Sequence, residues 1–176
     1  FHKDTKFVIA LGYLGHQVKD YLKNAHTDSN IEYVNVLNYK KKGSGPGKSL
    51  LYCESLLQKE FFFVPCDALW EGKISFDLKN NWVGTYKVNK KISNHYCNFS
   101  VKDSIVTNIL DKKEYKNSND VSFTGLMYIK DWKIFWKNLK DSNLKERQVS
   151  AGLRDLIKIK KVKSIPIQWY DVGTED

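Results

Sequence analysis

Long apolar runs, cysteine and arginine are scarce in this 176-residue sequence, and the first two scarcities exclude whole classes of protein. No apolar run is long enough to cross a bilayer, so we expect no membrane insertion. The three cysteines (Cys53, Cys66 and Cys97) are odd in number and widely spaced, which matches neither a zinc site nor a redox motif. We therefore expect a globular protein whose cysteines are buried in a reducing cytoplasm.

Arginine is scarce although the formal net charge is +9 at pH 7. Arg147 and Arg154 are the only two arginines, so the charge comes mainly from scattered lysines, with short clusters at 40–42 and 158–163. Proteins that read nucleic acids favour arginine at phosphates and base edges. The charge therefore indicates a solvated lysine-rich surface or a field that attracts anionic substrates, and an RNA-binding surface is a weaker alternative.

The sequence begins at Phe1, without an initiator Met and without a signal-peptide pattern. Its length fits one domain with a sizeable core, and it contains no internal repeat and no low-complexity linker. We expect residues 1–176 to form a single domain that is truncated at its N-terminus or processed.

Alternating strands and helices are expected in the first third of the chain. Short apolar runs, typical of buried parallel strands, are separated by stretches with apolar residues at helical spacing. This order predicts right-handed crossovers and a parallel sheet. The expected strands are 6–11, 31–37 and 61–66, and the expected helices are 15–24 and 49–57.

The remainder of the chain indicates antiparallel strands and further helices. Lys102-Asp103 is a tight turn signal between two of the strands, and Asp131 can cap a helix. The aromatic residues that follow Asp131 have helical spacing, which favours core packing over base stacking. The expected strands are 82–88, 96–101, 104–110, 123–129 and 162–168, and the expected helices are one after Asp131 and one over 146–159.

Two aspartates follow strands of this pattern. Asp67 comes after the run 61–66, and Asp171 lies in the stretch Trp169 to Thr174 after the run 162–168. In open α/β sheets, ligands bind beyond the carboxyl ends of the strands. Mg²⁺ takes oxygen ligands, usually one or two carboxylates together with phosphates and water. Each aspartate alone would more often be a turn or cap residue, but the pair predicts a magnesium site over a phosphate.

The segment 43–49 is rich in glycine and invites comparison with a phosphate-binding loop. Gly47-Lys48-Ser49 closes the Walker A pattern, but that pattern needs a glycine five residues before Gly47, where Lys42 stands. Pro46 also removes one amide donor. We therefore expect the backbone of Gly43-Ser44-Gly45 to approach a base or a sugar, with a flexible connection as the alternative.

Few other residues are placed for chemistry. Lys112 follows a strand next to Asp111 and could bind a substrate phosphate as a point charge. Gly125 lies inside a strand, which often marks close approach by a ligand or by another backbone segment. The four histidines have no catalytic partners in the sequence, and Cys66 has no nearby histidine, so a thiol nucleophile is not expected.

Five segments are informative when taken together and in order. They are Val8 to Gly15, the glycine-rich loop, the strand ending at Asp67, Thr124-Gly125-Leu126, and Trp169 to Thr174. In this order they resemble the sugar-phosphate nucleotidyltransferases, which include the nucleoside-diphosphate-sugar pyrophosphorylases and the related phosphocholine cytidylyltransferases. The resemblance covers essentially the whole chain. It implies a Rossmann-like mixed, mainly parallel sheet flanked by helices, with an antiparallel strand insertion.

The resemblance also implies roles for individual residues. Asp67 and Asp171 match the two metal-binding aspartates, with Mg²⁺ as the cofactor. Asp67 is also expected beside the nucleotide, where Gly43-Ser44-Gly45 match the loop that contacts the base. Lys112 matches a lysine that binds the acceptor's phosphate and takes part in catalysis. The residues expected on the acceptor side are Asp111, Lys112, Gly125, Glu146 and Trp169.

The sequence departs from the family pattern in three places. Pro65-Cys66 precedes Asp67, where the family usually has a glycine. Asp111 stands where the family often has a glutamate that binds sugar hydroxyls. The family's opening glycine-rich loop, which cradles the triphosphate, would lie before Phe1. We therefore expect this chain alone to bind nucleotide poorly and to be inactive.

The expected activity is a Mg²⁺-dependent transfer of a nucleoside monophosphate from a nucleoside triphosphate to a small phosphorylated acceptor, with release of pyrophosphate. The acceptor is a sugar 1-phosphate or a phosphocholine-like compound, and CTP is slightly favoured as the donor. Such an enzyme would serve surface polysaccharide (capsule) or lipid biosynthesis in the cytoplasm, without a nucleic-acid partner and with a homo-oligomer left open. The alternative is a non-catalytic basic binding module, with an RNA-binding or scaffold role, derived from this fold.

Overall fold

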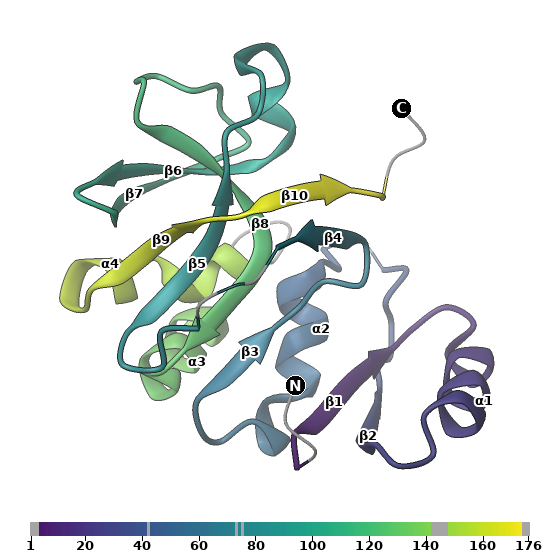
Figure 1. The fold of residues 1–176 in the computed structure, drawn as a ribbon. Coiled ribbons are helices and arrows are strands. Elements are labelled where there is room, and N and C mark those ends of the chain that lie inside the picture. Colours follow the sequence, from purple (N-terminus) through teal and green to yellow (C-terminus); the bar gives the residue numbers. More distant parts are fainter. Residues whose placement is uncertain (1–3, 42, 73, 75, 142–147, 174–176) are drawn as a thin grey trace.

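The computed structural model describes residues 4–41, 43–72, 74, 76–141 and 148–173 as a mixed α/β fold (Figure 1). Within these ranges, no helix is long and apolar enough to cross a membrane. The strands are β1 (Lys6–Leu11), β2 (Asn30–Asn35), β3 (Phe61–Phe63), β4 (Ala68–Glu71), β5 (Asn81–Tyr86), β6 (Cys97–Lys102), β7 (Ile105–Asp111), β8 (Asp120–Ile129), β9 (Val162–Pro166) and β10 (Gln168–Asp171). The α-helices are α1 (Gly15–Ala25), α2 (Pro46–Tyr52), α3 (Trp132–Asp141) and α4 (Leu156–Ile159), and the 3-10 helices are η1 (Glu54–Leu56), η2 (Lys90–His95) and η3 (Val149–Leu153).

The first two strands, joined by α1, form a parallel two-stranded sheet. The helix begins very close to the end of β1, because a methyl group at Gly15 would lie 2.9 Å from the Cβ atom of Leu11. The missing side chain at position 15 therefore lets α1 start directly beyond the strand and carry the chain back to β2. The strands and the helix predicted for this region are confirmed.

The second sheet has six strands in the order β3-β8-β5-β9-β7-β6. Strand β8 pairs antiparallel with both β3 and β5, and β5 pairs parallel with β9. Strands β3, β5 and β9 therefore run in one direction, and β8 runs against them. Strands β6 and β7 form an antiparallel hairpin at the far edge, and β6 also pairs with β8. This arrangement confirms the expected mixed α/β fold with antiparallel strands, but the six-stranded sheet is not mainly parallel as expected, since only the β5–β9 pairing in it is parallel.

The expected three-stranded parallel sheet is wrong in one respect, since β3 pairs with β8 and not with the first two strands. Phe61 lies opposite Ile129 in this pairing, and both side chains are buried in the main core. The N-terminal pattern could not reveal this partner, because β8 is formed by residues far later in the chain. Burial of Phe61, and not the order of the first elements, therefore decides where β3 pairs.

The main core lies between the six-stranded sheet and α3. Phe135, Trp136 and Leu139 are buried on α3. The Trp136 ring stacks on Phe61 of β3 at a centroid distance of 5.2 Å. Burying a large apolar side chain contributes roughly 1.5–3 kcal/mol to folding. The prediction that the aromatic residues after Asp131 pack in the core is confirmed for Phe135 and Trp136.

The expectation of one helix over 146–159 is wrong. Within the described residues of that stretch, Val149–Leu153 form η3 and only Leu156–Ile159 are α-helical. All five residues of η3 are buried, and a methyl group at Gly152 would lie 2.3 Å from Cε2 of Phe135. Close packing against α3 therefore decides the local conformation and overrides the helical spacing of the apolar residues.

The last expected strand divides in two near Pro166. Strand β9 stays in the six-stranded sheet, whereas β10 leaves it and pairs antiparallel with β4, with Asp171 opposite Ala68. Pro166 contributes no N–H to the ladder, and the Ile167 N–H still donates to the carbonyl of Thr85 at 3.0 Å. This division matters for function because β10 carries Asp171 to Asp67, the residue just before β4.

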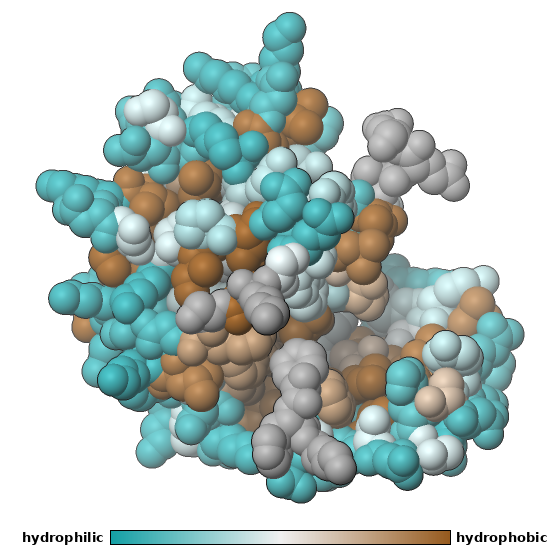
Figure 2. All heavy atoms as spheres, in the orientation of Figure 1, coloured by the Kyte–Doolittle hydropathy of each residue, from teal (hydrophilic) through white to brown (hydrophobic). Residues whose placement is uncertain are grey.

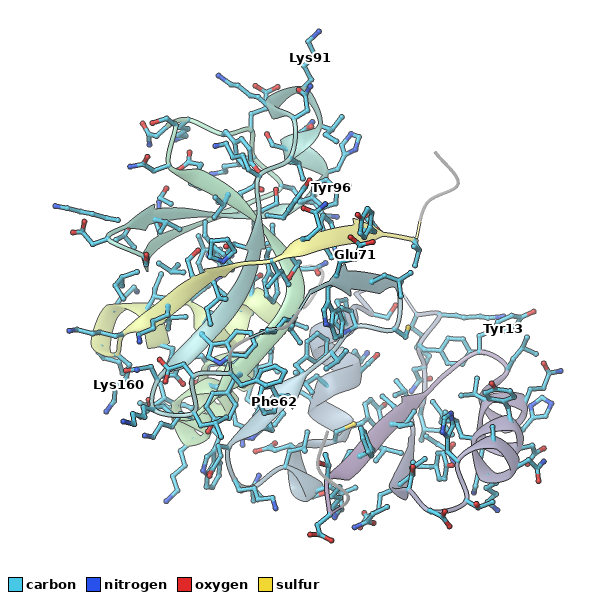
Figure 3. All side chains as sticks on the ribbon, viewed as in Figure 1. Tyr13, Phe62, Glu71, Lys91, Tyr96 and Lys160 are labelled. Atoms are coloured by element: carbon cyan, nitrogen blue, oxygen red, sulfur yellow. The ribbon has the colours of Figure 1, made fainter. Side chains whose placement is uncertain are left out.

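The surface agrees with the solvated-lysine interpretation of the charge. Lys91 projects at the top of the view in Figure 3 and Lys160 at its left edge. Hydrophilic side chains occupy much of the periphery of the face shown in Figure 2, with hydrophobic side chains gathered between them. Scattered cations of this kind create a general field for anions and do not by themselves mark a nucleic-acid groove.

Candidate active site

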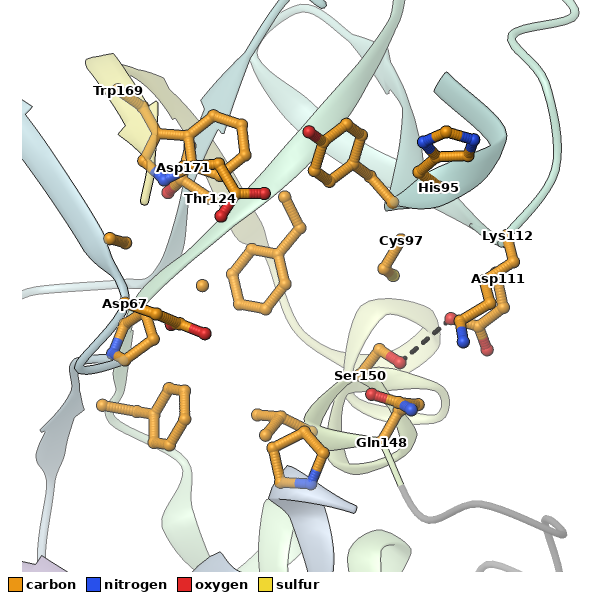
Figure 4. Close-up of a pocket in the computed structure, with 18 residues that line it drawn as sticks. Asp67, His95, Cys97, Asp111, Lys112, Thr124, Gln148, Ser150, Trp169 and Asp171 are labelled. Atoms are coloured by element: carbon orange, nitrogen blue, oxygen red, sulfur yellow. Dashed lines mark hydrogen bonds between the residues drawn. The ribbon is translucent and has the colours of Figure 1, made fainter. Parts of the chain in front are cut away.

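A cavity of about 520 Å³ is lined by residues of β4, β8, β10 and η3 and of the turn that follows β7. It collects most of the site residues expected from the sequence, although they come from distant parts of the chain (Figure 4). Those residues are Asp67, Asp111, Lys112, Gly125, Trp169 and Asp171.

The two predicted metal aspartates lie side by side. The Val172 N–H donates to the carbonyl of Asp67 at 3.1 Å, which joins the two segments just beyond the β4–β10 pairing. A methyl group built on Gly173 would lie 3.3 Å from Oδ1 of Asp171 and 3.3 Å from Oδ2 of Asp67. One oxygen of each carboxylate therefore borders the same small space in front of Gly173.

This pair suits a hard divalent cation. Asp67 is exposed and Asp171 half-buried, and neither forms an ion pair with any of the residues that the structure describes. Those same residues contain no group of three or more His, Cys, Asp or Glu that could hold a metal alone. Mg²⁺ commonly needs only one or two protein carboxylates, because phosphate oxygens and water complete its shell. The residues present therefore fit Mg²⁺ delivered together with a phosphate-bearing ligand.

The carboxylate of Asp111, at the other end of the cavity, is already occupied. Ser150 Oγ donates to its Oδ1 at 3.0 Å, and the Arg154 guanidinium pairs with its Oδ2. Burial raises the pKa of the neighbouring Cys97 thiol, and the negative charge of Asp111 raises it further. Asp111 therefore lines the cavity, but its oxygens are engaged within the protein, and its role toward an acceptor stays a prediction.

Lys112 reaches the cavity from a tight turn after β7. Its φ of 46° lies in the left-handed region, which is uncommon for a residue with a side chain, and its N–H donates to the carbonyl of Tyr96 at 3.2 Å. The buried Asn98 supports this turn, because its Nδ2 donates to the carbonyls of Lys113 and Ser93 at 2.7 Å each. The turn is thus built into the fold and carries Lys112 to the end of the cavity away from Asp67 (Figure 4).

Gly125 brings a neighbouring segment close to β8. Its φ is +88°, and a methyl group there would lie 2.5 Å from Cγ of Pro65. The close approach predicted for this glycine is therefore made by the segment Pro65-Cys66, which leads directly into Asp67. Gly125 also lines the cavity. Its lack of a side chain allows the segment before Asp67 to pack against β8.

Trp169 forms an aromatic wall of the cavity. Its side chain is 8% exposed, and its Nε1–H has no hydrogen-bond partner among the described residues. The ring of Tyr96 packs edge-on against it at a centroid distance of 5.4 Å. Buried polar groups are normally paired, so an unpaired indole N–H on a residue that lines the cavity is a candidate donor for a ligand oxygen.

Sequence reasoning missed Tyr96, which lines the cavity between Trp169 and the Lys112 turn. Burial raises the pKa of its phenol, and the negative charge of Asp171 raises it further, so the hydroxyl stays protonated. The predicted hairpin could not reveal this, because its turn lies at 103–104 and not at Lys102-Asp103, and a shift between Ser100 and Val101 sets the register that places Cys97 opposite Asp111. The cavity lining also includes Gln148 and Ser150, which had no recognisable pattern in the sequence.

The predicted base-contacting loop lies at the margin of this cavity. Of the glycine-rich segment only Pro46, the first residue of α2, lines the cavity, and Gly43-Ser44-Gly45 precede it. Gly43 has a φ of 82°, which a glycine adopts freely. The nucleotide role of the three loop residues stays a prediction. Glu146, expected on the acceptor side, lies outside the described residues.

Comparisons with known proteins bear on this site and this fold. No protein-family model matches the chain. The Bifunctional protein GlmU of Methanocaldococcus jannaschii is 26% identical over 165 residues, which cover 92% of this chain. The chain spans 38% of the length of that relative.

Solved structures extend the comparison to the fold. The structure of a UDP-glucose pyrophosphorylase complexed with UDP-glucose matches with a TM-score of 0.71 and 18% identity, over 95% of this chain and 75% of that one. The UTP-bound UGPase of Acinetobacter baumannii matches with a TM-score of 0.69 and 15% identity, over 91% of this chain and 63% of that one. In sequence and in fold, this chain thus resembles the sugar-phosphate nucleotidyltransferases.

Proposed function

We propose that this chain forms the core of a metal-dependent nucleotidyltransferase. The reaction transfers a nucleoside monophosphate from a nucleoside triphosphate to a small phosphorylated acceptor and releases pyrophosphate. One observation carries the proposal: the carboxylates of Asp67 and Asp171 meet at one end of the cavity that has Lys112 at its other end. Anionic oxygens at one end and a cation at the other suit a substrate pair that meets through phosphates.

Each of these residues has a role in the proposed mechanism. Asp67 and Asp171 would hold a divalent cation, which would supply charge neutralisation at the α-phosphate. Lys112 binds the acceptor's phosphate as a point charge and orients one of its oxygens toward the α-phosphorus. The new P–O bond forms while the bond to the β-phosphate breaks, and the electron pair leaves with pyrophosphate. Positioning and electrostatics supply the catalysis, so no covalent enzyme intermediate is needed.

The cavity suggests how the acceptor is held. Lys112 and the unpaired Nε1–H of Trp169 are donors for acceptor oxygens, whereas the Asp111 carboxylate is already bound by Ser150 and Arg154. We propose a sugar 1-phosphate or a phosphocholine-like compound as the acceptor. The enzyme would then act in surface polysaccharide or lipid synthesis. Our slight preference for CTP stays a prediction. UTP is an equally good candidate for the donor, because two structures with this fold contain UDP-glucose and UTP.

A pyrophosphate-release assay tests the proposal. The protein that contains this chain is incubated with Mg²⁺, each of four nucleoside triphosphates, and a panel of sugar 1-phosphates and phosphorylated amines. We expect release with one pairing, its loss on removing the metal with EDTA, and its loss in Asp67→Asn and Asp171→Asn. Asp155→Asn is the matched control, because Asp155 pairs with Lys158 at the surface. Release that survives both site substitutions would overturn the proposed role of the pair.

A further inference from the structure

We infer that Gly173 serves the two-carboxylate site by having no side chain, so that a divalent cation can reach Asp67 and Asp171 together. This inference rests on the proposed function, since it assigns a third residue to the same cation site. Its basis is the position of Gly173. A methyl group there would lie 3.3 Å from one oxygen of each aspartate, closer than nearly all ordinary contacts of a Cβ atom.

The backbone does not explain why a glycine stands at this position. Gly173 is not among the glycines whose φ lies in the left-handed region, so other residues can adopt its conformation without strain. Gly72 is the opposite case within the same part of the molecule. Its φ is +85°, yet a methyl group there would meet nothing within 4 Å. Space is therefore the requirement at Gly173, and conformation is the requirement at Gly72.

Two hydrogen bonds keep Gly173 in place. Its own N–H donates to Oδ1 of Asp171 at 3.0 Å, and the preceding Val172 N–H donates to the carbonyl of Asp67 at 3.1 Å. With the backbone held in this way, a methyl group would require the two carboxylates to shift by a few tenths of an ångström from their present positions. The segment 172–173 is thus hydrogen-bonded to the side chain of Asp171 and to the backbone of Asp67. These bonds fix the distance between the Cα atom of Gly173 and the two aspartates.

The space in front of Gly173 matters when a cation binds the two carboxylates. Mg²⁺ approaches its oxygen ligands to about 2.0–2.1 Å and keeps several water molecules. A methyl carbon equally near the two carboxylate oxygens occupies space beside the cation that those waters and a phosphate oxygen would use. Loss of groups that orient or accommodate metal ligands typically weakens metal binding about 10–100-fold.

The test is a Mn²⁺ titration followed by electron paramagnetic resonance of the free ion, with Mn²⁺ alone as the probe. We expect Gly173→Ala to weaken binding about 10-fold or more, and Gly173→Val to weaken it further, with the melting temperature of both unchanged. Gly72→Ala is the matched control. It should lower the melting temperature, because alanine is strained at that φ, and should leave the Mn²⁺ affinity of the chain unchanged.

The outcomes separate this inference from the proposed function. If wild-type protein binds Mn²⁺ and Asp67→Asn does not, while Gly173→Ala and Gly173→Val bind as tightly as wild type, the inference is wrong and the metal site stands. If wild-type protein binds no Mn²⁺ either alone or in a repeat titration with inorganic phosphate present, or if Asp67→Asn binds it equally well, both the inference and the proposed metal site are wrong. Weakened binding in Gly173→Ala with an unchanged melting temperature supports both.

Discussion

Both ends of the cavity carry aspartates, but these aspartates have different surroundings. At the β4–β10 end, Asp67 and Asp171 stand side by side, and neither forms an ion pair with the described residues. At the other end, Asp111 also closes a strand, but Arg154 and Ser150 take up its two oxygens. An aspartate at a strand end is therefore not a site by itself. Its neighbours decide whether it is available to a ligand or already part of the scaffold.

Electrostatics gives this difference a functional meaning. Like charges close together repel each other, so under the proposed function a divalent ion between the two carboxylates would stabilise this end. The Asp111–Arg154 pair is electrically satisfied and gains little from a further ligand. The comparison predicts that chemistry depends on the first end, and that acceptor shape is set at the second.

The largest expected effect separates the ends by kinetics. Asp67→Asn should lower kcat by roughly 100-fold or more, because it removes charge stabilisation at the reacting phosphate. Asp111→Asn should mainly raise the KM for the acceptor, since it weakens the pair with Arg154 and disturbs Ser150, which lines the cavity. Steady-state kinetics with the acceptor varied will distinguish the two variants. Equal losses of kcat would mean that the two ends do not differ in the way described.

A smaller effect concerns how firmly the acceptor end is built. Asn98 is fully buried, donates to two carbonyls, and accepts from Oγ of Ser122 at 2.7 Å. Asn98→Ala removes three hydrogen bonds of a buried side chain, so it should lower the free energy of unfolding by about 1–3 kcal/mol. Urea denaturation measures the change. Asn119→Ala, at an exposed position, is the control and should stay within about 0.5 kcal/mol of wild type.

The smallest effect uses the cysteines as reporters of the two ends. Cys66, next to Asp67, is exposed, whereas burial raises the pKa of Cys97 beside Asp111. The thiolate is the reactive form, and a raised pKa keeps the thiol protonated until the pH is high. Iodoacetamide at pH 8 should therefore modify Cys66 first, and the rate at Cys97 should increase only at more alkaline pH.

Cys53 provides an internal reference for that experiment. Burial raises its pKa to about 11, so only about one thiol in a thousand is ionised at pH 8. Mass spectrometry of the peptides gives the three rates, and all three should become similar in urea. Labelling of Cys97 as fast as that of Cys66 in the folded protein would contradict the buried, negatively charged surroundings assigned to the acceptor end.

The sequence could place Asp67 and Asp171 near each other because the evidence for that pairing is local, and their metal-binding role stays a proposal. Asp67 and Asp171 each follow an apolar run, and strands that end near one another bring their terminal residues together. The approximate positions of most strands and helices follow from the same short-range patterns. The division of the last strand near Pro166 could also have been predicted from the sequence, since proline has no N–H to donate to a strand ladder.

The acceptor end could not be predicted in the same way because its contacts are long-range. Arg154 reaches Asp111 from the segment after η3, whose apolar residues have the spacing of a regular helix, and tight packing of Gly152 on Phe135 produces a different conformation. The pairing of β3 with β8 depends likewise on burial between distant strands. Periodicity in a sequence indicates which face is apolar, but it does not identify the partner.

The most direct test of the account is anomalous diffraction from crystals of the protein soaked with Mn²⁺ and a nucleoside triphosphate. We predict an anomalous peak in front of Gly173, at about 2.1 Å from one oxygen of Asp67 and one oxygen of Asp171. A peak bound elsewhere, with the two aspartates free of metal, would contradict the central claim that this carboxylate pair holds the cation for nucleotidyl transfer.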